Sequence, residues 1–116
     1  MKTFLAIFTG SPESMENWKS LDAAQREAKE KAGMDAWNAW GQQHQGSIVD
    51  HGTPLGKTKR ISAGGIADIR NNMAAYTVVR AASHEDAAKL FEQHPHFTTF
   101  PGDAVEVMEC LPLPGA

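Results

Sequence analysis

The chain has 116 residues, within the ~100–200 residues of a typical domain, so we expect one domain spanning residues 1–116. Hydrophobic residues make up 41% of the sequence and charged residues 22%, a composition that indicates a globular protein and excludes a disordered one. The net charge of −3 argues against binding to nucleic acid or to an anionic membrane surface. The one cysteine, Cys110, excludes an intramolecular disulfide and a multi-cysteine zinc site.

The first apolar segment is short. It runs from Phe4 to Phe8, and Gly10 and Pro12 follow closely. A secretory signal needs ~7–15 apolar residues and a membrane helix ~18–20, so we expect neither, and we expect a cytoplasmic protein with no membrane partner. A continuous run of aromatic and β-branched residues predicts instead an interior strand over residues 3–9, covered on both faces.

A helical region is predicted between residues 11 and 45. Ser11 can cap a helix and Pro12 suits its first position, while Ser20–Asp22 predicts a second start. Gly46 is a plausible stop. Apolar residues recur at helical spacing in two stripes, the first formed by Trp18, Leu21, Ala24, Ala28 and Ala32 and the second by Trp37, Trp40 and His44.

The rest of the chain alternates extended and helical segments. Residues 48–49 predict a short extended piece, and Gly64–Gly65 predicts the turn of a hairpin. A helix should begin after Ser83 and end at Pro95, which places His94 at its carboxyl end. Four further strands are predicted over residues 57–62, 66–69, 74–82 and 104–109.

The order of these elements predicts an α+β fold. We expect a ferredoxin-like βαββαβ domain, an antiparallel sheet with its helices on one face. The strands over residues 3–9 and 74–82 are apolar on both sides, and two helices cannot cover both faces of such a sheet. A second copy of the same sheet is the simplest cover, so we expect a homodimer that forms a dimeric α/β barrel.

Several segments in this order resemble one family. They are Lys2–Ile7, Gly52–Leu55, Ala75–Val79, Glu85–Ala88, His94–Pro95 and Glu106–Val107. Together they resemble the YCII-related family of dimeric α/β-barrel proteins, which includes members with an Asp-Gly-Pro-Phe signature. At the place of that signature this chain has Asp68-Ile69-Arg70-Asn71, which keeps only the aspartate. The resemblance implies the fold and the dimer, and a His–Asp pair as the catalytic dyad of some members.

Three residues, His94, His51 and Asp68, are predicted to be catalytic. Histidine titrates near neutral pH, so His94 can act as a general acid or base, paired with Asp68 or Asp103. His51 lies in a turn that leads into the sheet, where functional side chains often occur. The simpler interpretation is that His94 caps its helix and His51 is a surface turn residue.

A second group of residues is predicted to bind a substrate. Tyr76 needs a partner for its hydroxyl if buried, which suits a pocket wall, and His96 follows His94 closely. Lys57 and Arg60 could hold an anion, or they could protect an exposed edge strand. Trp37 and Trp40 could line a pocket for a small aromatic or fatty ligand, or they could belong to the core.

No cofactor and no metal ion are expected. His94, His96 and His51 could form part of a facial metal site, but Pro95 between two of the ligands disfavours it. The residues around Gly56 lack the spacing of a phosphate-binding loop. Two functions stay open: a cofactor-independent lyase, isomerase or hydrolase that uses His/Asp acid–base chemistry on a small molecule, and a non-catalytic small-molecule binding or accessory dimerisation module.

Overall fold

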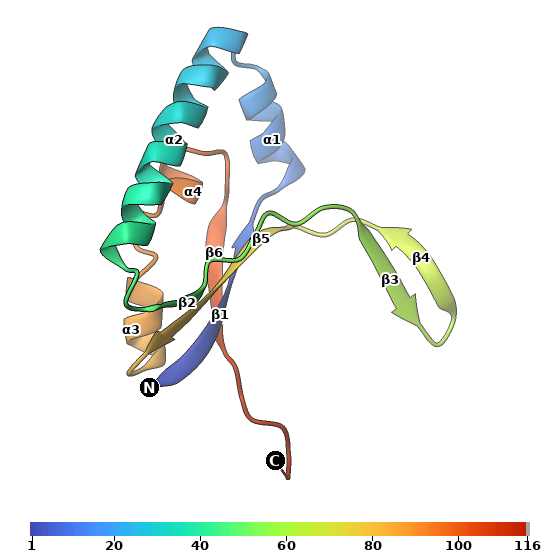
Figure 1. Ribbon diagram of the computed structural model, residues 1–116. Helices are drawn as coiled ribbons and strands as arrows, with labels where there is room; N and C mark the ends of the chain where they lie inside the picture. Colours follow the sequence, from blue (N-terminus) through green and yellow to red (C-terminus); the bar gives the residue numbers. More distant parts are fainter. Residues whose placement is uncertain (116) are drawn as a thin grey trace.

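A four-stranded antiparallel sheet forms the centre of the protein (Figure 1). The structure, a computed structural model, describes residues 1–115. The strands are β1 (Lys2–Thr9), β2 (Ile48–Asp50), β5 (Met73–Ala81) and β6 (Ala104–Glu109), in the order β2-β5-β1-β6. This arrangement agrees with the predicted α+β, ferredoxin-like class, and the strands expected over residues 3–9, 74–82 and 104–109 are present.

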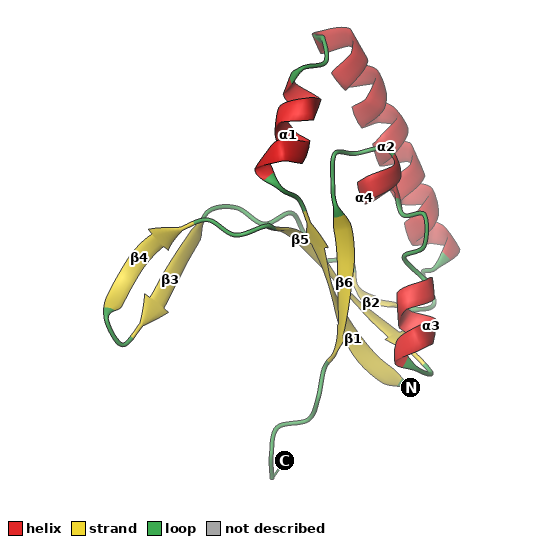
Figure 2. Cartoon of the chain, turned by 180° about the vertical axis from the view of Figure 1, so that it is seen from behind, coloured by secondary structure: helices red, strands yellow, loops and turns green. Residues whose placement is uncertain are grey.

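The helices lie on one side of this sheet (Figure 2). They are α1 (Pro12–Lys19), α2 (Ala23–Gln43), α3 (His84–Lys89) and α4 (Pro95–Thr98). The break predicted near residue 21 is present, because the Asp22 carboxylate accepts a hydrogen bond from Gln25 N while the Gln25 side chain accepts one from Asp22 N.

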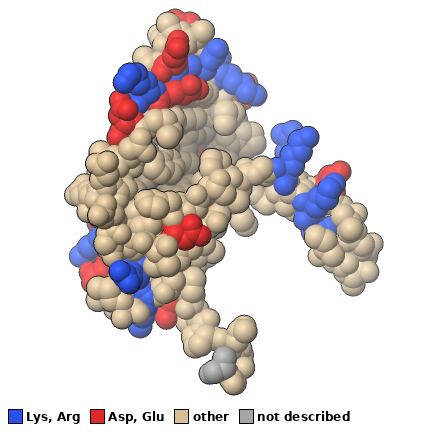
Figure 3. Space-filling model, in the orientation of Figure 1, with Lys and Arg blue, Asp and Glu red and all other residues tan. Residues whose placement is uncertain are grey.

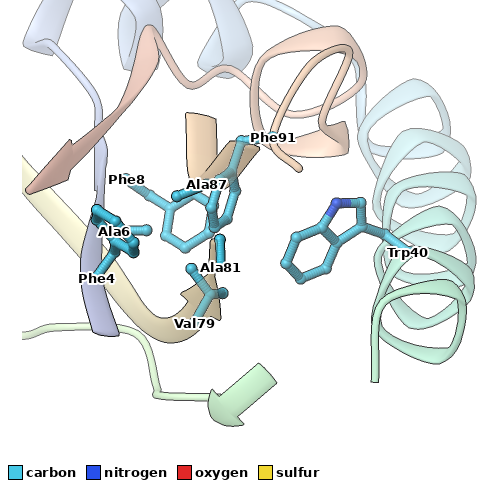
Figure 4. Close-up of a cluster of buried hydrophobic side chains, with 8 residues drawn as sticks. All are labelled: Phe4, Ala6, Phe8, Trp40, Val79, Ala81, Ala87 and Phe91. Atoms are coloured by element: carbon cyan, nitrogen blue, oxygen red, sulfur yellow. The ribbon is translucent and has the colours of Figure 1, made fainter. Parts of the chain in front are cut away.

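The core fills the space between the sheet and the helices (Figure 4). In β1, alternate residues point to the helices, and the side chains of Phe4, Ala6 and Phe8 are fully buried. Trp40 of α2 reaches toward them and donates a hydrogen bond from Nε1 to the carbonyl of Leu90 over 2.8 Å. The complete cluster comprises Phe4, Ala6, Phe8, Trp40, Val79, Ala81, Ala87 and Phe91.

The opposite face of the sheet is not covered by any helix within residues 1–115 (Figures 1 and 2). Its centre is mostly apolar, because the register sets Leu5 opposite Val78 and Met108, and Ile7 between Tyr76 and the one charged neighbour, Glu106. These side chains are half-buried or exposed in the single chain.

The predicted hairpin forms, but its two strands do not join the four-stranded sheet, and this corrects the ferredoxin-like strand arrangement that we expected. Strands β3 (Thr58–Ser62) and β4 (Gly65–Ile69) pair only with each other, and they project from the body of the protein (Figure 1). Residues 53–55 occupy the edge of β5 instead, since Leu55 N donates to Ala74 O over 2.9 Å and Tyr76 N donates to Thr53 O over 3.4 Å. The short β2 therefore pairs with β5 at the edge of the four-stranded sheet, where a strand of the hairpin was expected.

Two helical predictions are also corrected. The helix after Ser83 ends at Lys89, and Pro95 begins α4 instead of ending the earlier helix. Ala24, Ala28 and Ala32 are exposed, because the first half of α2 extends beyond the sheet (Figure 1).

Within residues 1–115, no helix has both the length and the apolar composition needed to cross a membrane.

Candidate functional site

A cleft of about 770 Å³ lies between α2 and the sheet, on the side where the molecule is visibly hollowed (Figure 3). Three segments form its walls: the second half of α2, the loop of residues 51–54, and residues 74–77 of β5. His96 and Phe100 from the segment around α4 complete it. The predicted Trp37 and Trp40 both line this cleft, together with Met34.

The lining of the cleft carries no formal charge. Within residues 1–115, the residues that line it include no Lys, Arg, Asp or Glu. Its polar residues are Asn38, Gln42, Gln45, Thr53, Tyr76, Thr77 and the histidines His51 and His96. Apolar walls with a few hydrogen-bonding groups suit a small uncharged molecule, since a charged one would lose its hydration without a counter-charge.

His96 is the histidine that α4 presents to the cleft. It is 7% exposed, and its Nε2 donates a hydrogen bond to the carbonyl of Thr9 over 2.7 Å. A carbonyl can only accept, so Nε2 carries the proton of the neutral ring and Nδ1 is the basic nitrogen. Burial lowers the pKa of His96, although the bond to Thr9 and the nearby Asp103 carboxylate oppose this shift. His96 is therefore neutral at pH 7 and able to accept a proton.

His94 lies behind the cleft and does not line it. The predicted catalytic role needs access to a substrate, and in this structure the side chain is 0% exposed. The imidazole packs against Trp37, Trp40 and Phe8, with ring centroids 4.5, 4.7 and 5.0 Å away. Burial lowers the pKa of His94 to about 4, helped by the positive charges that His96 and His44 can carry.

The position of His94 in its helix also differs from the prediction. It is the N-cap of α4, and its Nδ1 accepts a hydrogen bond from His96 N over 3.0 Å. Its proton therefore sits on Nε2, and within residues 1–115 no group accepts a hydrogen bond from that atom. The capping interpretation of His94 thus agrees with the geometry, at the opposite end of a helix from the one expected.

Asp103, not Asp68, is the carboxylate near the cleft histidine. The hydroxyls of Ser14 and Ser11 donate hydrogen bonds to Asp103 Oδ1 and lower the pKa of Asp103, which is exposed. The same residue donates from its backbone N to the carbonyl of Thr9 over 2.9 Å. Asp103 and His96 thus share Thr9 O as an acceptor, although Asp103 does not line the cleft itself.

His51 lines the cleft from the loop that leads into β5. A Cβ added to Gly41 would lie 3.7 Å from Cε1 of His51, so its ring rests over this turn of α2. The carbonyl of His51 accepts a hydrogen bond from Thr77 Oγ1 over 2.9 Å, which fixes the loop to β5. Gly52 follows with a φ of 72°, and any side chain there would overlap the carbonyl of Tyr76.

Tyr76 borders the cleft, but its register partner is Ile7. Alternation along β5 therefore directs the phenol to the uncovered face of the sheet. The predicted residues Lys57, Arg60 and Asp68 do not line the cleft at all, because they belong to the projecting hairpin and its approach. Asp68 instead accepts from Lys59 Nζ over 2.6 Å, and both side chains are exposed.

Gly102 is a residue of this site that the sequence prediction missed. A Cβ at position 102 would overlap the imidazole of His96. Its backbone N donates to the carbonyl of His96 over 2.9 Å, which closes the turn after α4. The Pro101–Gly102 pair signalled a turn in the sequence, but nothing in the sequence showed which side chain the turn would contact.

A smaller hollow of about 390 Å³ lies over α3 and β6, and it includes neither cleft histidine. His84 borders it and lies close to the carbonyl of Val107, with Nε2 at 2.7 Å. Within residues 1–115, no three His, Cys, Asp or Glu side chains gather as a metal site would require.

Comparison with known proteins supports the fold. No family model and no curated protein sequence matches the chain. Among solved structures, it is similar to 5-chloro-2-hydroxyhydroquinone dehydrochlorinase from Burkholderia phenoliruptrix in complex with 2,5-dihydroxybenzoquinone. The two chains share 15% sequence identity with a TM-score of 0.56, over 94% of this chain and 93% of the other. At this level the similarity supports the fold alone, an antiparallel sheet with helices.

Proposed function

We propose that this protein is a cofactor-independent enzyme that moves a proton on a small uncharged ring-shaped molecule bound in the cleft. The observation that carries the proposal is His96, a neutral imidazole at the wall of an uncharged cleft, with its Nε2 proton held by the carbonyl of Thr9. A histidine oriented in this way is a suitable general base.

The step is a simple proton transfer. The substrate loses a proton from an acidic C–H or O–H group, and His96 Nδ1 takes it up to become an imidazolium. The carbonyl of Thr9 and the Asp103 carboxylate favour that cation, since both raise the pKa of His96 against the effect of burial. His51, which also lines the cleft, is a second candidate residue for the reaction.

Two features support a ring-shaped substrate. Trp37 and Trp40 offer flat apolar surface inside the cleft, and aromatic faces favour stacked or edge-on rings. The dehydrochlorinase of similar fold binds 2,5-dihydroxybenzoquinone, which is a six-membered ring. An anion is disfavoured here, because Lys57 and Arg60 lie outside the cleft.

Deuterium exchange tests the proposed proton transfer without knowledge of the natural substrate. We expect the protein to accelerate exchange of the α protons of cyclohexanone in D₂O, followed by proton NMR. Replacement His96→Asn should reduce that acceleration by a factor on the order of 100 or more, since general bases contribute ~10²–10⁴-fold.

The matched control is His84→Asn. His84 also lies 2.7 Å from a backbone carbonyl, that of Val107, but outside the cleft, so this variant should keep the wild-type rate. Equal rates for His96→Asn and wild type, or no acceleration by wild type, would contradict the enzymatic proposal.

A binding module without chemistry is the second candidate. It is favoured by the uncharged lining, which holds no cationic or anionic side chain to stabilise charge that develops during a reaction. Quenching of tryptophan fluorescence by hydroquinone, without any acceleration of cyclohexanone exchange, would support this function over the enzyme.

We also propose that two copies associate through the uncovered faces of their sheets, around Leu5, Ile7 and Val78. These apolar side chains leave water when the faces meet. Analytical ultracentrifugation at micromolar concentration should give a mass of about 25 kDa, twice the 12.6 kDa of one chain. A species of 12.6 kDa alone would contradict the dimer.

A further inference from the structure

The β3–β4 hairpin stands away from the rest of the protein (Figures 1 and 2). We call residues 55–72, which contain it, the arm. The radius of gyration is 16.2 Å, whereas a compact chain of this length has about 13 Å. A lone two-stranded hairpin is at best marginally stable in water, so a projecting arm needs a surface to pack on.

The tip of the arm is apolar. Ile61 and Ile66 are direct cross-strand partners, so their side chains lie on the same face of the hairpin. They are 74% and 72% exposed in the single chain. Two exposed isoleucines side by side on a paired ribbon form a compact anchor for an interface.

The charge of the arm is opposite to that of the rest of the chain. The arm holds four of the eleven Lys and Arg residues and one of the fourteen Asp and Glu residues, so it carries +3 while the remainder carries −6. Figure 3 shows Lys and Arg side chains along the projecting hairpin. The uncovered sheet face carries two acidic residues, Asp50 on β2 and Glu106 on β6, against one cation, Arg80 on β5. A second copy of this chain is therefore an electrostatically matched partner.

The arm also lies on the correct side for such a contact. In both ribbon views the helices and the arm are on opposite sides of the four-stranded sheet (Figures 1 and 2). The arm thus extends on the side of the uncovered face, where the second copy would dock.

We propose that the arm packs on a second copy of this chain, with Ile61 and Ile66 buried in that contact. The inference rests on the proposed face-to-face dimer and adds a second contact, made by the arm, at the periphery of that dimer. The arm is also joined to the cleft, because Thr53 and Pro54 line the cleft just before the arm and Ala74 lines it just after. Packing of the arm on the partner therefore fixes one wall of the cleft.

Substitution of both isoleucines tests the contact between the arm and the second copy. Ile61→Thr/Ile66→Thr keeps the β-branched side chains that favour a strand but removes the apolar contact. We expect the dimer dissociation constant, measured by sedimentation equilibrium, to rise at least tenfold, since a few apolar anchor residues carry most of the binding energy of an interface. The matched control is Leu111→Thr/Leu113→Thr, whose leucines are 74% and 77% exposed outside the arm, and it should leave the constant unchanged. An unchanged constant for the arm variant would overturn the proposal.

A second measurement needs no substitution. Wild-type chains labelled at isoleucine methyl groups are mixed with unlabelled chains, and intermolecular NOEs are recorded. We expect them at Ile61 and Ile66, and at Ile7 of the sheet face, but not at Ile48, which packs against the core of its own chain. NOEs at Ile7 without any at Ile61 and Ile66 would overturn the arm contact and keep the sheet dimer. The reverse pattern would overturn the sheet dimer and, with it, the position of the arm contact at the periphery of that dimer.

Discussion

Replacement Phe8→Ala should lower the free energy of unfolding by about 3–5 kcal/mol, as expected for a fully buried phenylalanine. The Phe8 ring is 0% exposed and lies at the centre of an aromatic cluster. Its centroid is 5.0 Å from that of His94, 5.1 Å from Trp37 and 5.2 Å from His96. The truncation would remove these contacts and leave a cavity beside both histidines.

The effect can be measured by urea denaturation at one fixed protein concentration, because an associating protein unfolds in a concentration-dependent way. Phe97→Ala is the matched control, since Phe97 is only partly buried and should cost clearly less. Equal losses for the two variants would show that the core is not centred on Phe8.

Acidification should destabilise the protein before its carboxylates are protonated. The pKa of His94 is about 4 in the folded chain and ~6.5 in an unfolded one, so between these pH values only the unfolded chain takes up this proton. Proton uptake by the unfolded state alone favours unfolding, and the stability is therefore lost as the pH falls. The loss amounts to roughly 3 kcal/mol between pH 7 and pH 4. The lowered pKa of His96 acts in the same direction.

The variant His94→Asn separates this titration from the capping role. Asparagine is a good N-cap, so it keeps an acceptor for His96 N, but it does not titrate. The variant should be less stable than wild type at pH 7, since it removes a buried ring, and its stability should depend much less on pH. A pH dependence as steep as that of wild type would show that His94 is not the responsible group.

Local patterns in the sequence predicted much of the fold. Apolar runs identified β1 and β5, and Gly64–Gly65 identified the turn of the hairpin. These features depend on neighbouring residues, and so does the capping box at Asp22. The departure of the hairpin from the sheet could not be predicted, because it depends on residues 53–55 occupying the edge of β5.

The site was predicted in part. Trp37 and Trp40 follow helical spacing, which placed both on the face of α2 that lines the cleft. The role of Pro95 was ambiguous, because proline is common both after a helix and at its first position, and the second case applies. The position of Asp103 depends on Ser11 and Ser14, 92 and 89 residues away along the chain. A local sequence pattern cannot predict a contact between residues that lie so far apart along the chain.

The anchoring of His96 has a consequence for how this protein can diverge. Its imidazole is held by the main-chain oxygen of Thr9, which every residue type possesses. Evolution is therefore free to exchange the side chain at position 9 without releasing the ring. Position 102 cannot vary in this way, because the imidazole of His96 fills the space that even a methyl side chain would need. Among distant homologues that retain His96, we expect varied residues at position 9 and an invariant glycine at position 102.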